Sequence, residues 1–422
     1  MRLGVYGCGY LGNVVAACLS DFGLPVTCFD EDADRVTAVA HGSLPFHERN
    51  LDEVVRRNAR AGRLVYSTDV SQGAARSQIV YLGFDSHEGF EERGVQTARW
   101  MTRGSLMVLA TPVPVGTARR LEVRLQAENL KVTVVSHPIF LTDGCAVEDF
   151  NWPDRILLGT TSADAVALLK QIYRPLVMRG VPVIVTNHET AELAREASTA
   201  FLATKISFIN ELASLCEHVN ADAVDLALAL GLDKRIAPRC LQPGAGFGGA
   251  FAEADMNSLA ELADARGVSL KILDTAREVN RQHCERMAQK IDQAVQSLPG
   301  KDLGILGLAF KPNTNSAAAS SSILLAHHLL ARGAKVRAYD PVAMVQARHY
   351  LDERVLTCDS AYAAAQGADA LVLSTGWPEF RALDFDKIKR LLKRPVIIDT
   401  KNLLDSTRLR SMGFQYVGVG RN

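Results

Sequence analysis

A glycine-rich segment near the start of the chain has the residue types and spacing of a turn that binds the phosphates of a dinucleotide. Gly7, Gly9 and Gly12 form a G-x-G-x-x-G pattern between a short apolar stretch and a helical one. Glycines there permit a tight turn and let backbone N–H groups approach a pyrophosphate at the helix N-terminus. Asp30 closes the next apolar stretch, where a carboxylate accepts from both ribose hydroxyls and repels a 2′-phosphate. The segment therefore predicts binding of NAD in preference to NADP.

The motif alone is also compatible with a turn in some other α/β fold, but here strand, helix and acid stand in the expected order. We assign the following residues to the cofactor: Gly7, Gly9, Tyr10, Leu11, Gly12, Asp30, Arg35 and Thr111.

Alternating strand and helix signals predict how this segment is positioned. Continuous apolar runs separated by helical patterns are typical of a parallel sheet covered on both faces. In the first half of the chain they lie at residues 3–6, 25–29, 79–83 and 106–110. Residues 136–187 carry fewer strand signals. In the second half the runs return at residues 303–308, 335–339, 370–374 and 396–399.

A helical pattern fills the middle of the chain. Apolar residues repeat at helical spacing over residues 189–218 with almost no turn residue, which predicts one helix of about eight turns. Further helices are expected around residues 221–230 and 268–295, and Pro299-Gly300 ends the region. We expect an α/β chain with two Rossmann-like doubly wound parallel-sheet domains, residues 1–187 and 299–422, joined by a long central helix and an all-helical connector, residues 188–298.

The composition excludes several classes of partner. Lys plus Arg and Asp plus Glu number 47 each, so nothing electrostatic favours nucleic acid or an anionic membrane. No apolar run approaches the roughly 20 residues that span a bilayer, so we expect no membrane insertion. The 8 cysteines form no C-x-x-C pair, which predicts no metal site and a cytoplasmic protein.

Several segments resemble the UDP-glucose/GDP-mannose dehydrogenase family. The sequence A-V-E-D-F followed by P-D-R-I, residues 191–211 and the glycine loop at residues 243–249 are similar to its first and central domains. Residues 310–314, 339–342 and 377–380 are similar to its third domain. The resemblance covers essentially the whole chain in the right order.

The resemblance implies a reaction and the groups that perform it. Enzymes of this family oxidise the C6 alcohol of a nucleotide sugar to a carboxylate and reduce two NAD per turnover. A cysteine traps the intermediate aldehyde, because only a tetrahedral thiohemiacetal can release a second hydride, and water hydrolyses the thioester. A lysine and an asparagine stabilise the oxyanions.

The resemblance also implies partners. A UDP- or GDP-linked sugar would be held by Arg235, Phe247, Gly248, Gly249, Lys311 and Lys401. The second Rossmann-like domain, which lacks the full glycine pattern, would bind this nucleotide sugar. A homodimer is expected through residues 189–218, with Arg235 reaching the partner's substrate. Lys401 stands where the family usually has arginine, so a bidentate contact is lost.

The residues that would do the chemistry depart from the family pattern. The nucleophile position is Phe251, and the lysine that follows it is Ala254. The lysine and asparagine of the central helix are Arg195 and Thr199, and the glutamate that handles water is Ile139. The catalytic candidates that remain are Thr111, Arg195, Thr199 and Asp255, of which Thr111 and Asp255 could position a water as base in the first hydride step.

The cofactor end departs as well. The arginine expected to reach NAD is Ala318, and the V-G-T-P segment reads Leu-Gly-Phe-Asp at residues 82–85.

Replacements for the lost groups are few. Cys145 and Cys240 are expected to fill apolar space, and His137 is expected to be structural. Three carboxylates stand where the family pattern has none, and we expect them on a solvated surface. They belong to Asp143, Glu196 and Glu253.

Three functions remain open. The first is an altered oxidoreductase that performs at most one reversible hydride step. The second is a non-catalytic relative that either binds a nucleotide sugar or pairs with an active dehydrogenase. The third is a full dehydrogenase with an unrelated nucleophile. The retained glycines and Asp30 favour the first, and the loss at Ala318 favours the second.

Overall fold

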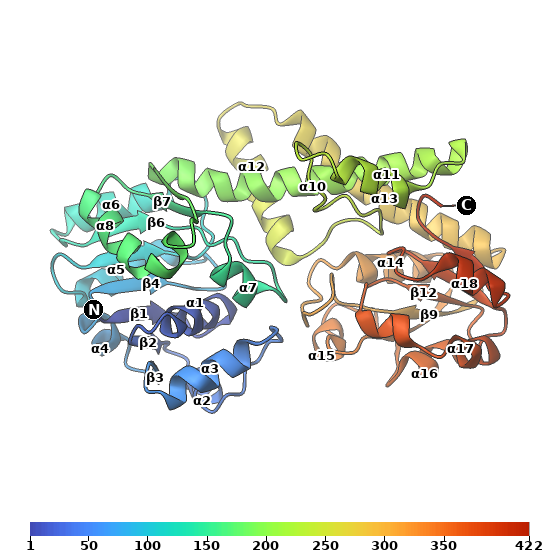
Figure 1. The fold of residues 1–422 in the computed structure, drawn as a ribbon, viewed down its shortest axis with the longest axis horizontal. Coiled ribbons are helices and arrows are strands. Elements are labelled where there is room, and N and C mark those ends of the chain that lie inside the picture. Colours follow the sequence, from blue (N-terminus) through green and yellow to red (C-terminus); the bar gives the residue numbers. More distant parts are fainter. Residues whose placement is uncertain (422) are drawn as a thin grey trace. The chain divides into compact units, whose positions relative to one another are not determined.

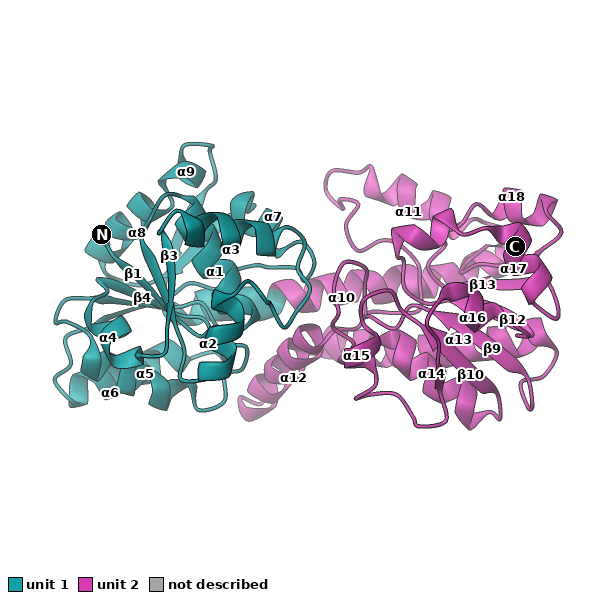
Figure 2. Cartoon of the chain, turned by 90° about the horizontal axis from the view of Figure 1, so that it is seen from below, with its two compact units in different colours: residues 1–197 teal, residues 198–422 magenta. Residues whose placement is uncertain are grey.

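The computed structural model of the protein describes residues 1–421. The chain divides into two compact units, residues 1–197 and residues 198–422 (Figure 2). The predicted division into three domains, with limits at residues 187 and 298, stays a prediction.

Unit 1 is a doubly wound Rossmann-type domain. Its sheet has the order β3-β2-β1-β4-β5-β6-β7-β8, and its first six positions are the order typical of dinucleotide-binding folds. The strands are β1 Leu3–Tyr6, β2 Val26–Phe29, β3 Leu64–Ser67, β4 Ile79–Leu82, β5 Leu106–Leu109, β6 Thr133–Ser136, β7 Ile156–Gly159 and β8 Val183–Thr186. Every neighbouring pair is parallel except β6 and β7.

Helices cover both faces of this sheet (Figure 1). They are α1 Tyr10–Asp21, α2 Ala33–Ala40, α3 Leu51–Arg60, α4 Val70–Ala75, α5 Phe90–Trp100, α6 Thr117–Ala127, α7 Ala146–Asn151, α8 Ala163–Ile172 and α9 Arg174–Val177. Val5 and Tyr6, successive residues of β1, belong to two different core clusters. Successive side chains of a strand point to opposite faces, so each face of the sheet has its own core.

The expectation that residues 136–187 are poor in strands is wrong. β7 and β8 lie there and extend the sheet beyond β6. Both are four residues long, as the predicted strands β1, β2, β4 and β5 are, so length does not set them apart. β8 is an edge strand whose Ile184 and Val185 are 45% and 47% exposed, so it lacks the fully buried character expected of a parallel strand.

Unit 2 contains a second parallel sheet, of order β11-β10-β9-β12-β13-β14. Its strands are β9 Asp302–Leu306, β10 Lys335–Tyr339, β11 Leu356–Thr357, β12 Ala370–Leu373, β13 Val396–Asp399 and β14 Gln415–Val417. The short edge strands β11 and β14 were not predicted. The helices around it are α14 Ser321–Ala331, α15 Met344–Ala347, α16 Ala361–Ala365, α17 Phe385–Leu391 and α18 Ser406–Ser411, with a 3-10 turn at Pro378–Ala382.

The middle of the chain is helical, as predicted. Its elements are α10 His188–Val219, α11 Ala223–Gly231, α12 Ala250–Ala265 and α13 Lys271–Val295. The division between the two units falls within α10. No helix within residues 1–421 is long and apolar enough to cross a membrane.

Candidate active site

The glycine motif forms the turn between β1 and α1. Gly7 has a φ of 115°, which favours glycine. A Cβ on Gly12 would lie 1.8 Å from the carbonyl oxygen of Gly7, so the helix can approach the strand this closely only without a side chain. The two glycines therefore perform the roles that a dinucleotide-binding turn requires.

Asp30 lies against this turn, just past the end of β2. Its Oδ2 accepts a hydrogen bond from the backbone N–H of Cys8 at 2.7 Å, and its Oδ1 accepts from the N–H of Asp32 at 3.0 Å. The guanidinium of Arg35 is 3.5 Å from Oδ2. A carboxylate fixed in this place can receive the hydroxyls of a ribose.

A cavity of about 250 Å³ opens beside these groups. Four of the predicted cofactor residues line it: Gly7, Gly9, Asp30 and Arg35. It is also lined by Tyr6, Glu31, Phe84, Asp85, Ser86 and Arg93.

The carboxylate of Asp85 lies over the N-terminus of α1. Its Oδ2 accepts from the backbone N–H of Tyr10, and its Oδ1 accepts from that of Leu11, each at 3.0 Å. The sequence shows an acid three residues after the end of β4, but not that this acid folds back onto the helix.

Thr111 has its hydroxyl committed to the backbone of unit 1. The hydroxyl accepts from the N–H of Phe84 at 2.7 Å and donates to the carbonyl of Leu82 at 3.0 Å. Thr111 is buried and is not among the residues that line the cavity.

The other altered positions of unit 1 lie on different elements. Ile139, at the position predicted for the family glutamate, is half-buried and packs against the core. Arg195 is half-buried on α10.

His137 is structural, as expected. Its Nδ1 lies 2.8 Å from the carbonyl of Leu157, and its Nε2 lies 2.9 Å from the hydroxyl of Tyr173. Burial lowers the pKa of His137 to about 4.

The expectation that the additional carboxylates are all on the surface is wrong for Glu196, which is 4% exposed. It lies one helical turn beyond Glu192, which is also buried and accepts from the N–H groups of Gly116 and Ala118 at 2.6 Å and 2.9 Å. This side of α10 therefore packs inward. Asp143 is half-buried, and Glu253 is exposed as predicted.

In unit 2 the glycine loop at residues 243–249 is held from both sides. The N–H of Gly244 donates to Asn210 at 2.9 Å, and the Nε2 of His283 lies 2.7 Å from the Gly244 carbonyl. Asn280 bonds both backbone groups of Phe247, at 2.8 Å and 3.1 Å. Asn210, Asn280 and His283 were not predicted, and no local pattern in the sequence distinguishes them.

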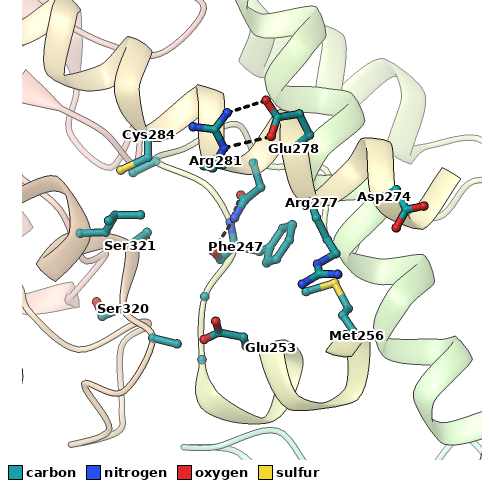
Figure 3. Close-up of a pocket in the computed structure, with 16 residues that line it drawn as sticks. Phe247, Glu253, Met256, Asp274, Arg277, Glu278, Arg281, Cys284, Ser320 and Ser321 are labelled. Carbon is teal, nitrogen blue, oxygen red and sulfur yellow. Dashed lines mark hydrogen bonds and ion pairs between the residues drawn. The ribbon is translucent and has the colours of Figure 1, made fainter. Parts of the chain in front are cut away.

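A cavity of about 610 Å³ lies beside this loop. Phe247, Gly248 and Gly249, all predicted to bind substrate, line it together with residues of α12, α13 and α14 (Figure 3). The ring of Phe247 packs against a small apolar cluster that includes Met256. The wall is polar on the side of α13, where Arg281 pairs with Glu278 at 2.6 Å (Figure 3).

The three predicted cations do not line this cavity. Lys401 lies beneath the loop, since a Cβ on Gly244 would be 3.8 Å from its Nζ. Burial lowers the pKa of Lys401 to about 8, although Asp399 and Cys284 oppose this. Lys311 lies 5.6 Å from the ring centre of Phe310. Arg235 has 89% of its side chain exposed and pairs with Asp233 at 2.6 Å.

The position predicted for the family nucleophile lies in the first turn of α12. Phe251 there is 38% exposed. Asp255, one turn further, is buried and accepts from the hydroxyl of Thr199 at 2.8 Å. The structure thus brings together two of the predicted catalytic residues within unit 2, but neither is a nucleophile of the cysteine type.

The two other candidate cysteines, Cys145 and Cys240, are half-buried. Burial raises the pKa of Cys240, although three nearby cations act in the opposite direction. No group of three or more metal-ligating side chains occurs within residues 1–421.

The order of the first sheet, its glycine turn and the second parallel sheet define the class of NAD-binding α/β dehydrogenases with two Rossmann-type folds. The chain belongs to the UDP-glucose/GDP-mannose dehydrogenase family. Residues 1–177 match its NAD binding domain, residues 189–282 its central domain, and residues 304–406 its UDP binding domain.

Individual relatives agree along the whole chain. A UDP-glucose 6-dehydrogenase of Rhizobium meliloti is 36% identical, covering 100% of both chains. One of Pseudomonas aeruginosa is 35% identical, covering 100% of this chain and 98% of the other. The solved structure of a UDP-glucose dehydrogenase from Pyrobaculum islandicum superposes with a TM-score of 0.88 at 30% identity, covering 100% of this chain and 98% of the other. The predicted family, fold class and NAD as cofactor are confirmed.

Proposed function

We propose that this chain is an altered NAD-dependent nucleotide-sugar dehydrogenase in which the two-step oxidation to a uronic acid is lost or changed. The observation that carries the proposal is Phe251, which stands at the nucleophile position in the first turn of α12. A phenyl ring forms no thiohemiacetal, so the second hydride has no covalently held carbon to leave from.

Most residues of the predicted NAD site in unit 1 fit the dinucleotide, and one does not. Gly7, Gly9, Gly12 and Asp30 have the geometry that the dinucleotide fold uses, and Asp30 selects against a 2′-phosphate. NAD supplies the hydride acceptor when bound. The carboxylate of Asp85 does not fit a pyrophosphate at the helix N-terminus.

The residues of unit 2 suit a nucleotide sugar. The glycine loop at residues 244–249 lies beside a cavity that can receive a ligand, and Lys401 lies beneath the loop. Lys311 adds a second cation. Arg235 is exposed, as a residue that reaches a partner's substrate must be. We assign UDP- or GDP-linked sugars as the ligand class.

The first hydride step makes fewer demands than the second. The sequence predicts Thr111 and Asp255 as the pair that positions a water as proton acceptor, but the hydroxyl of Thr111 is bonded to the backbone. Thr199 is the residue whose hydroxyl bonds to Asp255, so we assign this role to Thr199 and Asp255. Arg195 can stabilise an oxyanion, but arginine does not exchange protons near neutral pH. We therefore expect at most one reversible hydride transfer.

The test is the stoichiometry of NADH formed from UDP-glucose, followed by absorbance and by chromatography of the sugar. We expect no uronate and at most one NADH per sugar. The variant Phe251→Cys should also make no uronate, because Ile139 and Ala254 still replace the glutamate and lysine. Two NADH and one uronate per sugar from the unmodified protein would refute the proposal, and Cys145→Ala and Cys240→Ala would then locate the nucleophile.

The second candidate is a non-catalytic relative that binds a nucleotide sugar or partners an active dehydrogenase. It is favoured by Ala318, which offers no guanidinium to NAD, and by the carboxylate of Asp85 over α1. Calorimetry separates the two: sugar binding without measurable NAD binding supports this candidate over the first.

A further inference from the structure

The two backbone donors at the start of α1 are both taken by one side chain. Tyr10 and Leu11 are the first two residues of the helix, and their N–H groups donate to the two carboxylate oxygens of Asp85. N–H groups at the start of a helix have no partner within the helix. In a dinucleotide fold, a pyrophosphate oxygen receives them.

The same carboxylate fills the space above Gly9. A Cβ on Gly9 would lie 2.0 Å from Oδ2 of Asp85. The absence of a side chain at this position is what lets a pyrophosphate approach the turn. Asp85 thus uses both the donors and the space that the phosphates need, and it adds a charge of the same sign.

The cations around the cavity do not cancel this negative charge. Asp30 and Glu31 line the cavity together with Asp85. Arg35 also lines it, but its guanidinium pairs with Asp30 at 3.5 Å and with Asp32 at 3.4 Å. The guanidinium of Arg93 stacks on the ring of Phe84 at 3.7 Å and its Nη2 donates to the carbonyls of Ser86 and Glu88 at 3.2 Å and 2.9 Å. Arg93 therefore holds the backbone turn that carries Asp85 instead of offering its charge to a phosphate.

The turn is fixed, whereas the Asp85 side chain is exposed. Phe84 is 5% exposed and its N–H bonds to Thr111. Rotation of one exposed side chain can release the helix N-terminus without moving this backbone.

We infer that Asp85 is an internal competitor for the pyrophosphate of NAD: its carboxylate occupies the phosphate position on α1 and must rotate away before the dinucleotide binds. The inference deepens the proposed function and rests on its assignment of NAD to unit 1. Asp85 would therefore lower the affinity for ligands that carry a pyrophosphate. The affinity for a nucleoside without phosphates would stay the same.

The experiment compares ligands with and without a pyrophosphate on the full-length chain. Calorimetry measures the affinities of NAD, ADP-ribose and adenosine for the unmodified protein and for Asp85→Ala and Asp85→Asn. Removing a capping carboxylate frees donors worth a factor of roughly ten in binding. We expect Asp85→Ala to bind NAD and ADP-ribose about tenfold more tightly, Asp85→Asn to gain less, and adenosine to change less than twofold.

Glu88→Gln is the matched control, because it removes an exposed carboxylate three residues further along the same turn. Thermal unfolding checks that each variant is folded. An unchanged NAD affinity in Asp85→Ala, or an equal gain in Glu88→Gln, overturns the inference and leaves the proposed function standing. Absence of binding by both the unmodified protein and Asp85→Ala overturns the assignment of NAD and the inference with it.

Discussion

Lys401 shows what one substitution would do to the chemistry of the proposed nucleotide-sugar site. The family resemblance implies arginine at this position, and arginine stays charged at every accessible pH. Lysine loses its proton readily when buried, and burial lowers the pKa of Lys401 to about 8. The charge beneath the glycine loop is therefore complete below that pH and disappears above it.

We predict that affinity for a UDP-sugar falls as pH rises from about 8 to 9.5. A bound diphosphate favours the protonated amine, so above its free pKa Lys401 must take up a proton on binding, and the affinity drops up to about tenfold per pH unit. Calorimetry with UDP-glucose across this range measures the drop, and buffers of different ionisation enthalpy report the proton taken up.

Lys401→Arg keeps the charge at all these pH values and should flatten the profile. Identical profiles for lysine and arginine would show that Lys401 does not face the diphosphate.

At the scale of elements, the glycine loop depends on a buried histidine of α13. The Nε2 of His283 lies 2.7 Å from the Gly244 carbonyl and must carry the proton, because a carbonyl only accepts. Among the described residues, no group hydrogen-bonds to its Nδ1. Burial lowers the pKa of His283 to about 4. The folded protein therefore holds the neutral ring, while the unfolded chain binds a proton more readily.

We predict that this histidine makes unit 2 less stable in mild acid. A lowered folded pKa gives stability that is complete above the unfolded value near 6.5 and is lost as pH falls toward 4. Between pH 7 and pH 5 the loss from His283 is about 2 kcal/mol. Urea unfolding at the two pH values measures it.

His283→Gln keeps a donor for Gly244 but does not titrate. Between pH 7 and pH 5 its free energy of unfolding should therefore fall by about 2 kcal/mol less than that of the unmodified protein. His349→Gln, which replaces an exposed histidine of the same unit, is the control. An equal fall in His283→Gln and the unmodified protein would contradict the prediction.

The elements that sequence predicts well are those whose signal is local. α10 was expected at residues 189–218 and spans His188–Val219, because helical spacing continues without a turn residue. β1, β10 and β13 have their predicted bounds. β8 was missed because an exposed edge strand lacks an apolar run. α12 was missed because few of its residues are buried and its alanines give no periodic face.

The same distinction holds within the site. The glycines and Asp30 were predicted, since a turn dictates its own residue types. Asp85 reaches Tyr10 from 75 residues away, and Asn280 reaches Phe247 from 33. Such contacts are set by how strands and helices pack, which no local pattern records.

At the scale of the whole molecule, unit 2 exposes an apolar stripe on α10. Phe201, Phe208 and Leu215 follow one another at seven-residue intervals and are 66%, 52% and 55% exposed. This spacing places them on one side of the helix. Leu228 of α11 is 62% exposed, and Leu232, directly after this helix, is 74% exposed. Large apolar side chains exposed along one side of a helix are typical of an interface.

We predict that the chain forms a homodimer through this stripe. Two copies would give twice the 45.8 kDa of one chain in light scattering at micromolar concentration. Phe208→Glu places a charge in the centre of the stripe, where burial of a charge without a partner costs several kcal/mol. The dissociation constant of the dimer should therefore rise roughly a hundredfold or more. Val123→Glu, at a site on α6 that is 58% exposed, introduces the same charge outside the stripe and should leave the dimer intact. A monomer in the unmodified protein, or equal dissociation by both variants, would place the interface elsewhere or remove it.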